Sequence, residues 1–125
     1  MRPTPDVRVI AWLERQPPET LYLTTVSVAE MLYGVARLPD GKKKHRLSSM
    51  LQSILDFYGD RVLVFDYQAA CSHAAISVAT AMVGKKLPAA DGYIAAMAAA
   101  KGYAVASRDE GPFLAAGLEV INPWD

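Results

Sequence analysis

The chain has 125 residues, of which 52% are hydrophobic and 21% charged, a composition typical of one soluble globular domain. Its thirteen basic and thirteen acidic side chains cancel, which argues against a large nonspecific nucleic-acid surface but leaves room for a local groove. Neither a membrane span nor a secretion leader is recognisable, so we expect a single cytoplasmic domain over residues 1–125. The lone Cys71 excludes an internal disulfide and, among alanines, is predicted to be buried.

The first predicted elements are a helix, a strand and a second helix. A hydroxyl, a proline and an acid at residues 4–6 predict a helix start. The short apolar run at residues 21–24 predicts a buried strand. Ser27 and Glu30 match a serine-x-x-glutamate capping box, which places the start of the next helix at Ser27.

The middle of the chain predicts a basic loop between helices and then a second strand. The run at residues 42–46 is interpreted as a solvated loop, with RNA backbone contact as the alternative, and a helix follows over residues 47–58. Residues 62–65 predict a buried strand. Asp66 is expected to cap a long helix that runs to about residue 83.

The last third repeats the alternation of helix and strand. A loop at residues 84–88 leads to an alanine-rich helix that Gly102 closes. The remaining predicted elements are a strand at 103–106, a short helix at 112–116 and a strand at 118–121. Because strands alternate with helices, we predict an α/β fold in which helices cover a small parallel sheet, a three-layer sandwich.

Three acids fall where strands end or the following helices begin, and each has a structural alternative. Glu30 could belong to its capping box. Asp91 heads a stripe with Ile94, Ala95 and Ala98 that must pack inward, although a helix start also favours an acid. Asp109 follows a strand and precedes a helix, where aspartate is also common as a cap.

Taken together, the three acids make a better case for a cation site than any one of them. In open α/β sheets, ligands gather beyond the carboxyl ends of the strands. Carboxylates collected at one edge repel each other unless a cation lies between them. Oxygen ligands favour magnesium or manganese over zinc. Ser107 and Arg108 could bind a phosphate or be plain loop residues, while His45 and His73 are interpreted as surface residues.

Four phrases resemble the PIN-domain family, and within it the VapC-type toxins of bacterial toxin–antitoxin pairs, especially the FitB-like branch. The phrases are VIAWLERQ, LYLTTVSVAEMLYGVARLP, LPAADGYIAAMAAAKGYAVASRD and VINPW. The resemblance covers nearly the whole chain. It implies a metal-dependent endoribonuclease in which acids on a small parallel sheet hold Mg2+, or Mn2+, for the hydrolysis of RNA.

Carried over residue by residue, the resemblance assigns the metal-binding and catalytic acids to Glu30, Asp91 and Asp109. It implies RNA as the substrate, a cognate antitoxin, a homodimer, no membrane, and DNA contact only through the antitoxin. Lesser contacts to the RNA backbone are expected from Ser107, Arg108, Lys85 and Lys86.

The N-terminus departs from the family pattern. Family members open with a strand of the type ILLDTN, whose aspartate is a further metal ligand and which lies centrally in the sheet. Here Met1 stands where that strand has already passed, so we expect this central strand and its acid to be missing. A late start is favoured over a trimmed chain or a decayed copy. The alternative function is a noncatalytic PIN-like module that still binds an antitoxin; a phosphoacceptor domain is weaker, because no lysine or hydroxyl is clearly placed to hold a phosphoryl group.

Overall fold

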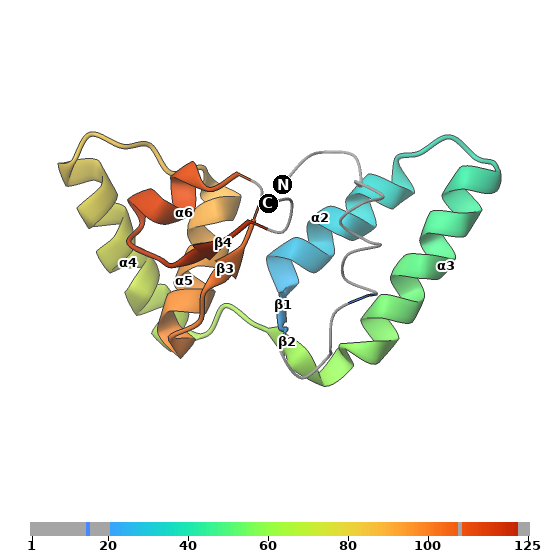
Figure 1. Ribbon diagram of the computed structural model, residues 1–125, viewed down its shortest axis with the longest axis horizontal. Coiled ribbons are helices and arrows are strands. Elements are labelled where there is room, and N and C mark those ends of the chain that lie inside the picture. The colour runs from blue at the N-terminus through green and yellow to red at the C-terminus, as the bar shows by residue number, and fades with distance from the viewer. Residues whose placement is uncertain (1–14, 16–20, 108, 123–125) are drawn as a thin grey trace. The chain divides into compact units, whose positions relative to one another are not determined.

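The computed structural model describes residue 15, residues 21–107 and residues 109–122 (Figure 1). The chain divides into two compact units, residues 1–63 and 64–125, each with its own hydrophobic core. The predicted first helix falls within residues 4–16, of which the structure describes Arg15 alone, as helical. The expected lack of the family's N-terminal strand stays a prediction. A single domain over residues 1–125 therefore stays a prediction.

The first unit alternates strand and helix as the sequence predicts. Its elements are β1 (Leu23–Thr24), α2 (Thr25–Ala36), α3 (Lys42–Phe57), the 3-10 helix η2 (Gly59–Arg61) and β2 (Val62–Leu63). β1 and β2 pair in parallel, with Leu23 opposite Val62. The second strand is shorter than predicted, because Val64 and Phe65 lie outside it and are exposed.

The cap of α2 is Thr24, three residues before the predicted cap Ser27. The Thr24 hydroxyl oxygen accepts a hydrogen bond from the Ser27 amide at 3.0 Å. Ser27 is therefore the third helical residue, and the predicted capping box of Ser27 and Glu30 is wrong. Thr24 is the last residue of β1, and its backbone is extended, at φ −108° and ψ 155°, which is the conformation that a helix N-cap residue adopts.

Replacing Thr24 with alanine is expected to lower the free energy of unfolding by about 1 kcal/mol, because the capping bond to the Ser27 amide is lost. The matched control is Thr25→Ala, since Thr25 is the first helical residue and is exposed. Urea denaturation followed by circular dichroism measures both variants. Equal losses in the two would contradict the assignment of Thr24 as the cap.

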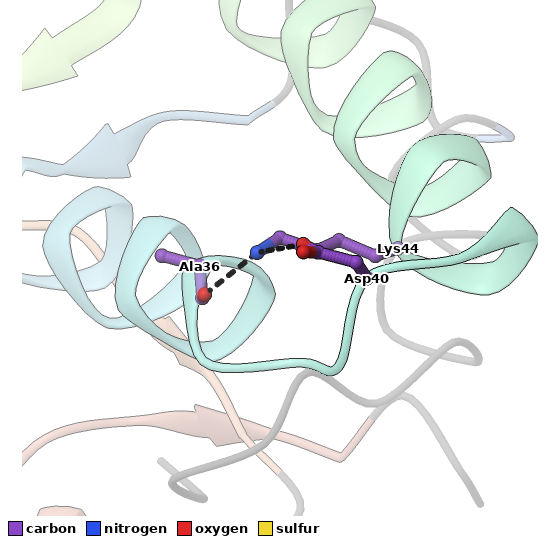
Figure 2. Close-up of polar contacts among 3 residues, drawn as sticks. All are labelled: Ala36, Asp40 and Lys44. Atoms are coloured by element: carbon purple, nitrogen blue, oxygen red, sulfur yellow. Dashed lines mark hydrogen bonds and ion pairs between the residues drawn. The ribbon is translucent and has the colours of Figure 1, made fainter.

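Helix α3 begins at Lys42, so the basic run predicted as a loop forms its first turns. Lysine favours helix, and the Lys44 ammonium reaches back to the end of α2 (Figure 2). Its Nζ atom donates to the Ala36 carbonyl oxygen at 3.0 Å and lies 3.5 Å from the Asp40 carboxylate. This contact satisfies an orphan carbonyl of α2 and joins the two helices across their connection.

The apolar face of α3 builds the core of the first unit. Leu47, Leu51 and Ile54 recur at helical spacing and are no more than 3% exposed. They pack with further buried side chains of the unit, namely Leu23, Met31, Val35 and Tyr58. Arg61 holds the segment just before β1 in place, because its Nε atom donates to the Leu21 carbonyl oxygen at 2.9 Å.

The second unit also alternates helix and strand. Its elements are α4 (Tyr67–Met82), α5 (Ala89–Lys101), β3 (Val105–Ala106), α6 (Gly111–Ala115) and β4 (Val120–Ile121). As predicted, Asp66 caps α4 by accepting from the Ala69 amide at 2.9 Å, and Gly102 ends α5 in the left-handed conformation at φ 72°. β3 and β4 pair in parallel. The parallel pairs and their helices confirm the α/β class.

Small side chains let α4 and α5 pack side by side (Figure 1). On α5, Ala95 and Ala96 are fully buried. On α4, the buried residues Ala69, Ile76 and Thr80 follow one face. Cys71 lies off that face and is exposed, so its predicted burial is wrong.

Candidate functional site

Asp91 is the buried acid of the second unit. It is the third residue of α5, after Ala89 and Ala90, and it is 8% exposed. As predicted, its face of the helix packs inward, with Ala95 and Ala98 buried and Ile94 half-buried. The predicted inward stripe is confirmed, and it brings a carboxylate to the edge of an apolar core.

Burial raises the pKa of the Asp91 carboxyl above the usual 3.8, and the nearby Asp109 carboxylate raises it further. Ionising Asp91 therefore costs free energy in the folded chain. Two carboxylates that repel each other at the edge of a core are suited to bind a divalent cation, because the cation would favour the charged form of both.

Because the folded chain holds the Asp91 proton more tightly than the unfolded chain, ionisation of Asp91 lowers the stability of the metal-free fold. We therefore compare the free energy of unfolding of Asp91→Asn with that of the native chain. The excess of the variant over the native chain should grow as the pH rises from 3.8 to the raised pKa of Asp91, and it should stay constant at higher pH. At neutral pH we expect the variant to melt at a higher temperature than the native chain. Thermal denaturation in chelator over a pH series measures the gap, and a gap that shrinks with rising pH would contradict this assignment.

Asp109 lies in an exposed loop just beyond the carboxyl end of β3. Its amide donates to the Ser107 hydroxyl oxygen at 3.1 Å, and that hydroxyl donates to the Asp109 carbonyl oxygen at 3.1 Å. Ser107 therefore shapes the loop that presents Asp109. Glu110 occupies the cap position of α6, so the alternative role of Asp109 as a helix cap is wrong.

A second contact at this edge was not foreseen from the sequence. The Asn122 side-chain amide donates to Glu110 Oε2 at 3.0 Å and links the end of β4 to the loop after β3. Both residues follow the ends of paired parallel strands, and that position is the signal that could have found them. The contact restrains the loop that carries Asp109.

Glu30 lies in α2 of the first unit. It is the sixth helical residue, one turn later than predicted, and it is half-buried with its Oε1 atom inaccessible to solvent. Asp91 and Asp109 belong to the other unit, so a site of all three acids stays a prediction. Within the described part of either unit, no three His, Cys, Asp or Glu side chains gather closely enough to hold a metal ion.

The other predicted contact residues differ in their surroundings. Lys85 and Lys86 are exposed in the loop between α4 and α5, as predicted. His45 is exposed, whereas His73 is half-buried and its ring stacks on Tyr93, so a plain surface role for His73 is wrong. Arg108 lies outside the described residues.

None of the helices in the described residues is long and apolar enough to cross a membrane.

Comparison with known proteins gives agreement over nearly the whole chain. The chain is 45% identical over 122 residues to the VapC ribonuclease Y4jK of Sinorhizobium fredii (strain NBRC 101917 / NGR234), covering 97% of this chain and 87% of that protein. It is 46% identical over 125 residues to the toxin FitB of Neisseria gonorrhoeae (strain ATCC 700825 / FA 1090), covering 99% and 90%.

Solved structures agree with the sequence relatives. The crystal structure of FitAcB from Neisseria gonorrhoeae matches with a TM-score of 0.83 and 47% identity, over 98% of this chain and 89% of that one. VapBC-5 from Mycobacterium tuberculosis, a member of the VapBC family of toxin–antitoxin systems, matches with a TM-score of 0.70 and 28% identity, over 81% and 80%. The PIN domain model matches residues 2–117. The chain therefore belongs to the PIN domain family and is similar to its VapC and FitB toxins.

Proposed function

We propose that the chain is a magnesium-dependent endoribonuclease toxin of a toxin–antitoxin pair that hydrolyses phosphodiester bonds in RNA. The observation that carries the proposal is the buried Asp91 carboxylate, with Asp109 acting on its pKa from the loop beyond β3, in a PIN domain. The names of the relatives agree, because they include a VapC ribonuclease and a toxin.

In this proposal Glu30, Asp91 and Asp109 hold Mg2+, or Mn2+ in its place. When bound, the ion would supply an activated water and neutralise charge on the phosphodiester. The chain's own part is positioning: the core fixes Asp91, and the Ser107 and Glu110 contacts fix the loop of Asp109. Lys85, Lys86, Ser107 and Arg108 contribute lesser contacts to the RNA.

The proposal includes a cognate antitoxin, since one of the similar solved structures is a member of a toxin–antitoxin family. It also includes a homodimer, for which exposed apolar side chains such as Leu32 and Tyr33 offer surface. DNA is contacted only through the antitoxin, and the site of action is the cytoplasm.

The test is a magnesium titration of the chain with a labelled single-stranded RNA, followed by gel electrophoresis and, in parallel, by thermal shift. We expect cleavage that depends on Mg2+ or Mn2+, and a melting temperature that rises with metal, because a ligand of the folded state stabilises it. Equal cleavage in excess chelator would contradict the metal mechanism. Neither cleavage nor a shift at millimolar metal would favour the noncatalytic module that only binds an antitoxin.

A further inference from the structure

The loop between α4 and α5 places two adjacent lysines between two hollows of the second unit. Lys85 and Lys86 line both. The smaller hollow, of about 210 Å³, is bounded by α4, the loop and the start of α5, and the larger, of about 490 Å³, by the loop and α6. The backbone of the loop is held to the end of α4 at Lys85, because the Lys85 amide donates to the Thr80 carbonyl oxygen at 2.9 Å.

The wall of the smaller hollow carries an imidazole in a fixed orientation. The His73 ring stacks on Tyr93 with 4.9 Å between the ring centroids, and Phe65 meets both rings edge-on. On its other side His73 adjoins Gly92, where a Cβ atom would lie 3.4 Å from His73 Nε2. Ser77, one turn further along α4, adds a hydroxyl to the lining. The hollow therefore offers an imidazole and a hydroxyl for hydrogen bonding, and the ring contacts hold the imidazole in place.

The charge of the smaller hollow is positive. Among the described residues that line it, two are lysines and none is acidic. Neither ammonium forms an ion pair with an acid in the part of the chain that the structure describes. Helix α5 also starts here without a side-chain cap, so its first amides point toward this region with the positive end of the helix dipole. These features all favour the binding of an anion in the smaller hollow.

We propose that the smaller hollow binds a phosphate group, held by the ammonium groups of Lys85 and Lys86 with the His73 ring and the Ser77 hydroxyl as hydrogen-bonding partners. Its volume of about 210 Å³ lies below the roughly 300 Å³ at which pockets for drug-sized ligands begin, which suits one phosphate or sugar-phosphate unit. The hollow includes the first turn of α5 through Ala89 and Gly92, and Asp91 belongs to that same turn without lining the hollow. The source of the phosphate rests on the proposed function: it is the RNA backbone.

The test is RNA binding in excess chelator, so that the result does not depend on cleavage. Fluorescence anisotropy with a short labelled single-stranded RNA compares the native chain with the double variant Lys85→Ala/Lys86→Ala. We expect about tenfold weaker binding, and a plot of log affinity against log salt that is less steep by about 0.7, the contribution of one neutralised phosphate of a single strand. The matched control is Arg37→Ala/Lys101→Ala, which removes two exposed positive charges that do not line the hollow and should bind within twofold of the native chain.

Equal losses in the two double variants would overturn the proposal, because the effect would then be one of net charge. No loss in either would overturn it as well. A second pair tests the wall of the hollow: Ser77→Ala should weaken binding severalfold, whereas Ser72→Ala, a half-buried serine of α4 that does not line the hollow, should not.

Calorimetric titration with inorganic phosphate separates the two sources of the ligand. Binding of RNA that depends on Lys85 and Lys86, with free phosphate competing only weakly, supports the backbone. Tight phosphate binding that leaves RNA affinity unchanged would overturn the RNA assignment. Because cleavage is absent from these measurements, a chain that fails to cleave RNA could still pass this test, and the reverse also holds.

Discussion

Replacing Asp91 with asparagine is expected to lower metal-dependent RNA cleavage by a factor of about 100 or more, since even residues that only support metal ligands cost 10- to 100-fold. The change removes the charge that the buried carboxyl presents to a cation, while the amide keeps its size. Single-turnover cleavage of a labelled RNA at saturating magnesium measures the effect. The same variant should fold at least as stably as the native chain, because the cost of ionising a buried acid disappears.

The matched control for this prediction is Asp60→Asn, an exposed acid of the first unit. It should keep cleavage within twofold of the native chain. An Asp91→Asn variant that cleaves as fast as this control would remove Asp91 from the site. A variant that loses both cleavage and cooperative unfolding would instead give Asp91 a structural role, against the expectation from its raised pKa.

The largest effect on stability is expected at Leu47. Its side chain is fully buried in the core of the first unit, and Leu47→Ala should lower the free energy of unfolding by about 3 kcal/mol through lost burial and the cavity left behind. For a chain of this size the melting temperature should fall by about 10 °C. Urea denaturation followed by circular dichroism gives the free energy directly.

Leu32→Ala is the control for Leu47, because Leu32 is 48% exposed on α2. Its cost should stay near 0.5 kcal/mol, roughly the range of surface substitutions. Similar losses at the two positions would mean that Leu47 does not lie in the core.

The sequence predicted the elements best where the signal is local. Asp66 as a cap and Gly102 as the end of α5 depend on a few neighbouring residues, and both are confirmed. The start of α2 was misplaced because Thr24 and Ser27 both offer a hydroxyl, and only the backbone conformation at Thr24 decides between them. The basic run at residues 42–46 forms helix instead of the predicted loop, because lysine and arginine favour helix even where their charges are concentrated.

In the candidate site too, features set by neighbouring residues were predictable and features set by tertiary contacts were not. The inward stripe headed by Asp91 follows from helical periodicity, which the sequence displays by itself. The link between Glu110 and Asn122 does not, because it joins residues twelve apart through the pairing of two strands. The exposure of Cys71 likewise depends on which face of α4 meets α5.

The sequence by itself therefore determined the α/β class, the family resemblance and three candidate acids, because periodicity, caps and motifs are properties of neighbouring residues. Only the tertiary structure decided that Asp91 is buried near Asp109, and that His73, Lys85 and Lys86 surround one hollow. The hollow arises where α4, α5 and their loop pack together, whereas the proximity of the two acids involves α5 and the loop after β3. Burial and charge at such a place depend on segments distant in sequence, which no local pattern records.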